Sequence, residues 1–158
     1  MEVKFFLCGQ SCSLDVRRNS ISIFHILEEV HAPAYPVVLP GLSIVALIAL
    51  DEGEPIDPRI ELRISLGDHR LFTGPFEANF EVRRTARVVA EFLAFVLPAP
   101  GLLRLVLHSA GREIANWQVP CEQNAPPQFE LHFQPGENPG AQQAPGADLT
   151  PPGAAQNP

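Results

Sequence analysis

Short segments in which apolar and polar residues alternate strictly dominate the pattern of this chain. Residues 60–66 alternate Ile and Leu with Glu, Arg and Ser, and residues 76–82 alternate Phe, Ala and Val with Glu and Asn. A period of two places every second side chain on the same face of a β-strand. Each segment therefore offers one apolar face to a core and one polar face to water.

Nine candidate strands follow one another, with proline- and glycine-rich turns between them. Residues 42–50 are apolar on both faces, which predicts a central strand covered on both sides; a short buried helix also fits this pattern. Residues 87–97 fit either a helix or a strand, and the β context favours a strand. The candidates are residues 3–8, 20–27, 42–50, 59–66, 76–82, 87–97, 103–107, 115–119 and 129–133.

The segments between the candidates carry turn and loop signals. Prolines at positions 33, 36 and 40 predict an extended connection between two sheets over residues 31–40. Residues 9–19 are polar and predict a turn, and residues 69–73 lie between two turn dipeptides. Gly111 predicts the turn of a hairpin between its two neighbouring strands.

The spacing of these elements predicts the fold class. Strands that recur about every ten residues indicate a two-sheet antiparallel β-sandwich of about eight or nine strands, with a Greek-key-like order. Strands do not alternate with helices, which disfavours a doubly wound α/β fold. Within the first strand, Val3, Phe5 and Leu7 are expected to share one face.

The composition changes near residue 134. Residues 135–158 contain six prolines, four glycines and five alanines, with Leu149 as their only large apolar residue. Such a stretch buries too little apolar surface to offset the entropy cost of ordering it. The sequence therefore predicts one β-sandwich domain over residues 1–133, followed by a disordered tail over residues 134–158.

Charge and short apolar runs narrow the expected partners and the compartment. The formal net charge of −7 argues against a general nucleic-acid binder, because Lys and Arg supply most of the binding to phosphates. The apolar run 5–8 is too short for a secretory signal, and the run 42–50 is far shorter than the ~20 residues of a membrane helix. We therefore expect a cytoplasmic protein of bacterial type, with no membrane partner.

Candidate chemistry is sparse. Cys8, Cys12 and Cys121 are odd in number and widely spaced, so they form neither a disulfide framework nor the two close pairs typical of zinc. None of the five histidines has an acid or nucleophile partner at a meaningful spacing. We therefore expect no catalytic residue and no cofactor; a metal-dependent or cysteine-dependent enzyme is kept as an alternative.

The loop after residue 50 is acidic. Asp51, Glu54 and Asp57 are weak candidates for calcium, because calcium binds the carboxylates of such loops. A solvated turn is the favoured interpretation, since the spacing does not match an EF-hand. A calcium-responsive sandwich is therefore the second alternative.

Two features are candidates for binding a protein partner. Tyr35 lies among prolines, where an exposed ring anchors a partner, although packing over a sheet edge fits equally well. Arg83, Arg84 and Arg87 form the one basic cluster, which offers bidentate pairing to an acidic partner; a solvated loop is the favoured interpretation. We expect a non-catalytic binding or scaffold module that acts through sandwich-end loops or an edge strand.

Three short stretches carry a resemblance to a known family. They are residues 3–8 leading to 20–24, residues 32–36, and residues 97–101 with the hairpin that follows. Over residues 1–119 the chain resembles a bacterial family of small β-sandwich proteins catalogued only as a domain of unknown function. The resemblance implies a β-sandwich and carries no catalytic residues. His25 stands where the pattern of that family has glycine.

Overall fold

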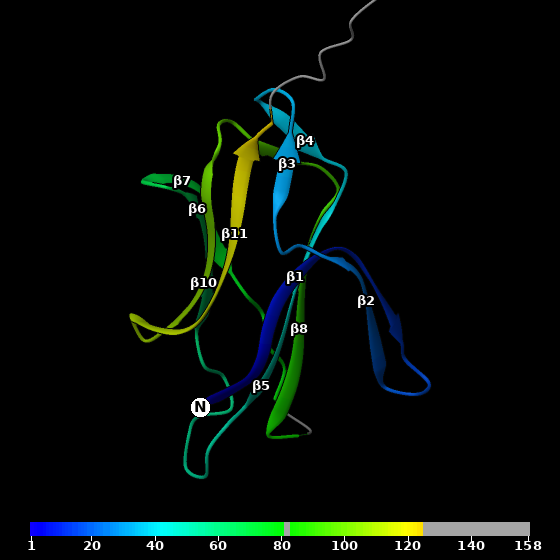
Figure 1. Cartoon of the computed structure of the whole chain (residues 1–158). Helices are drawn as coiled ribbons and strands as arrows, with labels where there is room; N and C mark the ends of the chain where they lie inside the picture. Colours follow the sequence, from blue (N-terminus) through cyan, green and yellow to red (C-terminus); the bar gives the residue numbers. More distant parts are fainter. Residues whose placement is uncertain (81–82, 125–158) are drawn as a thin grey trace, which may run out of the picture. The chain divides into compact units, whose positions relative to one another are not determined.

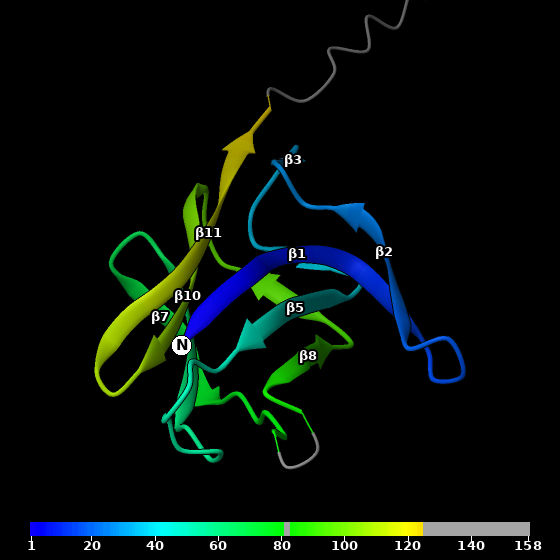
Figure 2. The ribbon, with the colours of Figure 1, turned by 90° about the horizontal axis from the view of Figure 1, so that it is seen from below.

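Two β-sheets pack face to face in the computed structural model of this chain, which describes residues 1–80 and 83–124 (Figures 1 and 2). One compact unit spans Met1–Pro126. The described residues contain eleven strands and no helix, which confirms the all-β prediction with more strands than expected. The expected strand over 129–133 and the expected tail lie outside the described residues.

The strands form two large sheets and one small one. All pairs are antiparallel except β11 with β3, which is parallel, so the antiparallel prediction holds for every pair but one. Sheet A has the order β2 (Ser20–Ile26), β1 (Glu2–Asp15), β5 (Leu42–Ala49), β8 (Thr85–Phe92). Sheet B has the order β3 (Val30–Ala32), β11 (Arg112–Gln123), β10 (Gly101–Ser109), β6 (Ile60–Leu66), β7 (His69–Pro75). The small sheet pairs β4 (Val37–Leu39) with β9 (Phe95–Leu97).

Additional strands lie in two segments that the sequence predicted as a connection or as a single element. The extended connection over 31–40 contains part of β3 and all of β4, and the candidate over 87–97 is a strand that divides into β8 and β9. Non-consecutive strands lie side by side, as β1 and β8 do on either side of β5, which is the long-range pairing of a Greek-key-like sandwich. The predicted hairpin is β10–β11, whose turn residues Ala110 and Gly111 both have positive φ.

The core lies between sheets A and B. The apolar residues of β6 alternate into it, which confirms the strict alternation seen in the sequence. Phe92 contacts Phe72 and Phe95 edge to face, with ring centroids 5.0 and 5.4 Å apart, and so links the three sheets. The fully buried side chains that meet in the core include Ile44 and Ile48 from sheet A and Leu62, Ile64, Leu103, Leu105, Leu107 and Val119 from sheet B.

The predicted strand over 76–82 is wrong. Its described part, residues 76–80, has no regular structure, and β7 instead occupies His69–Pro75, where a turn region was predicted. Phe76 and Phe80 are nevertheless buried, and the Phe76 N–H donates to the Ile60 carbonyl at 2.9 Å. The alternating residues thus mark where the chain is anchored as it leaves sheet B, while its backbone no longer follows the ladder.

β1 departs from the prediction in its length and in its faces. It runs through most of the expected turn over 9–19, so the connection to β2 is only Val16–Asn19. A register shift between Val3 and Phe5 inserts one residue against β5. After this bulge Phe6 and Cys8 face the core, so the prediction that Val3, Phe5 and Leu7 share one face is wrong.

The outer face of sheet A is apolar along β1 and β5 and is approached by the β1–β2 hairpin. In β8, the Arg87 side chain donates to the Asn19 carbonyl at 2.9 Å, and the Cys12 thiol donates to the Glu91 carboxylate at 3.4 Å. Val45, on the outward side of β5, has no exposed surface. Both faces of β5 are therefore covered, as predicted for a central strand.

Candidate partner-binding surface

Two stretches of the chain without charged residues meet at one end of the sandwich. Residues 32–50 and 92–103 contain no Asp, Glu, Lys, Arg or His. The short strands β4 and β9 come from these two stretches and pair with each other there. The longest charge-free segments of the sequence therefore meet in space, although more than fifty residues separate the two strands.

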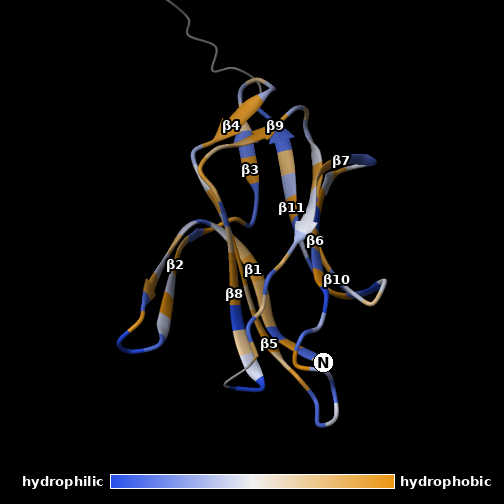
Figure 3. Cartoon of the chain, turned by 180° about the vertical axis from the view of Figure 1, so that it is seen from behind, coloured by the Kyte–Doolittle hydropathy of each residue, from blue (hydrophilic) through white to orange (hydrophobic). Residues whose placement is uncertain are grey.

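Large apolar side chains are exposed at this end. Val38 and Val96 are directly opposed across the β4–β9 ladder and are 56% and 53% exposed. Leu93, in the turn between β8 and β9, is 96% exposed. The alternate residues Leu39 and Leu97 point inward and are buried. Figure 3 shows β4 and β9 coloured mainly as hydrophobic. We call Val38, Leu93 and Val96 the β4–β9 surface.

Tyr35 lies just before β4 and is bonded to the end of β11. Its side chain is half-buried and packs against the core, and its hydroxyl donates to the Glu122 carbonyl of β11 at 3.3 Å. Burial also raises the pKa of Tyr35. The Gln123 amide donates to the Pro33 carbonyl at 3.3 Å, which ties the same loop to β11. The ring predicted as an anchor for a partner is thus mainly engaged within the protein.

The sequence did not predict that Val38 and Val96 are exposed, because valines within apolar stretches look like core residues. The exposure of Val38 follows from its register opposite Val96, which places both on the outward face of a two-stranded sheet. The signal present in the sequence is the absence of charge over residues 32–50 and 92–103. Exposed apolar groups without neighbouring charges are typical of protein interaction sites.

The predicted arginine cluster is divided between two places. Arg84 donates to the main-chain carbonyls of Leu50 and Asp51 beyond the end of β5, whereas Arg87 donates to Asn19 in the hairpin turn. Arg83 is exposed. Two of the three guanidinium groups are thus bound to the protein itself. The eight residues of β5 separate Arg84 from the end that carries Tyr35, so the two predicted surfaces are not joined.

The acidic loop binds an ammonium group of the same chain. The Met1 ammonium lies 2.6 Å from a carboxylate oxygen of Asp51 and 2.6 Å from one of Glu54. These contacts lower the pKa of both carboxyl groups and raise the pKa of the ammonium. Asp57 lies elsewhere, beside a groove. Among residues 1–80 and 83–124, no three His, Cys, Asp or Glu side chains are grouped so as to hold a metal ion.

The surroundings of the three cysteines are those of packed thiols and not those of reactive ones. Cys8 and Cys121 are buried free thiols, and burial together with the neighbouring Cys121 raises the pKa of Cys8 to about 12. Burial and the Glu91 carboxylate raise the pKa of Cys12. A nucleophilic cysteine needs a lowered pKa, because the thiolate is the reactive form. The pKa of each of the three thiols is raised instead.

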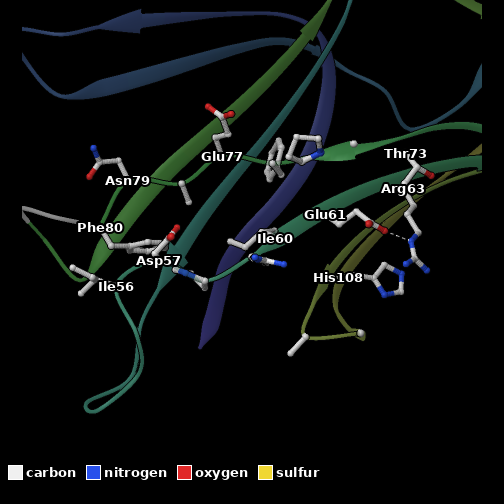
Figure 4. Close-up of a pocket in the computed structure, with 18 residues that line it drawn as sticks. Ile56, Asp57, Ile60, Glu61, Arg63, Thr73, Glu77, Asn79, Phe80 and His108 are labelled. Atoms are coloured by element: carbon white, nitrogen blue, oxygen red, sulfur yellow. Dashed lines mark hydrogen bonds and ion pairs between the residues drawn. The ribbon is translucent and has the colours of Figure 1, made fainter.

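An open groove of about 1240 Å³ lies beside β6, β7 and the β10–β11 turn (Figure 4). Its described lining contains neither Cys nor Ser, and within it Glu61 forms an ion pair with Arg63. His108 also lines the groove (Figure 4), and its buried Nδ1 has no hydrogen-bond partner in the described part of the chain. The groove combines the apolar residues Ile60, Phe76 and Phe80 with the charged residues Asp57, Arg59, Glu61, Arg63 and Glu77.

Comparison with models of known protein families and with curated proteins gives no match. The resemblance to a family of small bacterial β-sandwich proteins therefore stays a prediction. Within the described residues, no helix is long and apolar enough to span a membrane.

Proposed function

We propose that this protein is a non-catalytic binding module that holds a protein partner at its β4–β9 surface. The observation that carries the proposal is the exposed pair Val38 and Val96, which lies on two stretches of chain without charged residues. A partner of matching chemistry presents apolar side chains and buries them against these valines and Leu93.

Charge supports the choice of this end over others. Asp, Glu, Lys and Arg make up 18% of the chain, and their ionised groups must lose water when a partner docks on them. The β4–β9 surface contains none, and docking there carries no such desolvation cost. Charged residues are similarly depleted at the centres of protein interfaces.

The fixed position of β4 and β9 also supports the choice of the β4–β9 surface. Leu39, Phe95 and Leu97 anchor β4 and β9 in the core, and the Tyr35 hydroxyl is bonded to β11. Strands whose inner side chains are fixed in the core need little further ordering when a partner binds, which lowers the entropy cost of association.

The test compares two equally exposed residues. Val38→Asp places a charge on the β4–β9 surface, and Ile56→Asp places one beside the groove; both wild-type side chains are 56% exposed. Proteins from the native host are recovered on immobilised wild-type and variant chains and compared by mass spectrometry. We expect Val38→Asp to lose a specific partner that Ile56→Asp retains.

The circular dichroism spectra and melting temperatures of both variants should match the wild type, because each change is at a solvated position. Retention of all specific partners by Val38→Asp would reject the proposal. Loss with Ile56→Asp alone would also reject it and would assign binding to the groove.

A further inference from the structure

Among the edge strands of the two large sheets, β8 is neither short nor interrupted by a proline or a register shift. An edge strand exposes a row of unpaired N–H and C=O groups, and proteins block such rows with short strands, prolines or bulges. β3 has three residues, β7 ends in Gly74-Pro75 and has a register shift against β6, and β2 is interrupted by the positive φ of His25. Each of these three edges therefore resists addition of another strand.

β8 is long and regular by comparison. It pairs with β5 over eight consecutive positions without a register shift, and it contains neither proline nor glycine. Figure 2 shows it as the last strand of the row β1, β5, β8. Its inner side chains belong to the core, while Arg87, Val89 and Glu91 lie on the outer face.

We propose that β8 pairs antiparallel with β8 of a second copy of this chain, with the two-fold axis at Val89. In this register Val89 lies opposite Val89 of the second copy, and Arg87 lies opposite Glu91 of the second copy. The symmetry repeats the Arg–Glu pair on the other side. Two cross-strand pairs of opposite charge therefore flank one apolar pair, and all three stabilise an antiparallel ladder.

Other registers are disfavoured by the same residues. Moving the strands by two residues places Arg87 or Glu91 opposite Val89, and moving them by four places each of these charges opposite itself in one direction or the other. Like charges directly opposed are destabilising. A shift by one residue brings core-facing and outward-facing side chains together. The order Arg-Val-Val-Ala-Glu over residues 87–91 thus specifies one pairing.

Both charged groups retain bonding capacity within one copy. Arg87 donates to Asn19 through its terminal nitrogens, and its buried Nε–H has no partner in the described part of the chain. The exposed Glu91 carboxylate accepts the Cys12 thiol at 3.4 Å, which is a weak bond. A guanidinium–carboxylate pair across the edge is stronger than this thiol bond.

The experiment is sedimentation velocity on the full chain from low micromolar to several hundred micromolar concentration. We expect a dimer that dissociates on dilution. Arg87→Glu and Glu91→Arg should each weaken the dimer roughly tenfold or more, since each variant turns both cross-strand pairs into like-charge pairs. An equimolar mixture of the two variants should dimerise again, because each strand then opposes its complement.

The equimolar mixture of the two variants is the decisive measurement, since unfolded variants could not restore the dimer. Arg63→Glu makes the same change of charge on sheet B and should leave the dimer unchanged, as should Val38→Asp. If a reversal at 87 or 91 does not fold, Val89→Lys provides an independent test, because it opposes two ammonium groups at a solvated position. A wild type that stays monomeric, or variants that fail to complement, would overturn the inference.

Discussion

Sheets A and B bury their inner faces against each other, but their outer faces differ. The outer face of sheet B is polar, and Val106 is its one buried apolar residue among the described strands. The outer face of sheet A is apolar along β1 and β5, and β8 adds Val89 between Arg87 and Glu91. Its apolar residues are Phe5, Leu7, Val45, Leu47 and Val89, whereas sheet B presents Glu61, Arg63, Ser65, Arg104, Asn116 and Gln118.

The difference explains the bent β1–β2 hairpin. A polar face is solvated and needs no cover, whereas an apolar face gains stability when water is excluded from it. The hairpin supplies part of that cover and is joined to β8 by the bonds from Arg87 and Cys12. Sheet A is therefore a middle layer over part of its area, although the chain has only two large sheets.

Placing a carboxylate on each outer face gives the largest contrast. Val45→Asp buries an unpaired charge and should lower the free energy of unfolding by about 3–5 kcal/mol. Ser65→Asp adds the same carboxylate opposite Arg104 on sheet B and should change it by about 0.5 kcal/mol or less. Urea unfolding of both variants measures the difference. Equal midpoints would show that the outer face of sheet A is not shielded.

The sequence correctly predicted the elements that depend only on residues close together in the chain. The alternation over 60–66 and the β10–β11 hairpin were correct, because a two-residue period and a turn with Gly111 decide them. Residues 76–80 show the limit of the same rule. Their alternating apolar residues are buried as expected, but Pro75 has no N–H and the ladder ends there.

Features set by distant segments could not be predicted. The bulge in β1 exchanges its faces, and nothing in residues 3–5 distinguishes it from a regular strand. Tyr35 was placed correctly in the connection between sheets, but its bond to Glu122 depends on where β11 ends. The exposure of Val38 depends on β9, which the sequence analysis had merged with β8.

A smaller effect is expected where the hairpin leaves sheet A. A methyl group on Gly9 would lie 2.8 Å from the Phe24 carbonyl oxygen of β2, so Gly9→Ala forces two backbones apart. We expect a loss of about 1–3 kcal/mol in the free energy of unfolding. Amide exchange in residues 11–24 should also accelerate, because the hairpin then opens more readily.

Gly74→Ala is the matched control on sheet B. Its methyl group would lie 2.7 Å from Cζ of Phe72, the far end of a half-buried side chain that is able to rotate. Its cost should be below that of Gly9→Ala, with no change of exchange in the hairpin. Equal destabilisation by the two variants would mean that the bend at Gly9 has no special role in covering sheet A.

Thiol labelling sharpens the comparison without altering stability. Cys12 lies in the hairpin and is half-buried, whereas Cys8 and Cys121 lie buried between the sheets. In the native protein at pH 8, iodoacetamide should modify Cys12 first and reach the other two only through unfolding. Peptide mass spectrometry over time measures each site.

The labelling rate of Cys12 should rise steadily with pH, because burial and the Glu91 carboxylate raise the pKa of its thiol above the usual range and the thiolate is the reacting form. Glu91→Gln removes the carboxylate and should increase the rate at pH 8. Gly9→Ala should increase it too, by opening the hairpin, while Cys8 stays protected by the core. Modification of Cys8 as fast as Cys12 would contradict the distinction between a closed inner face and a partly covered outer one.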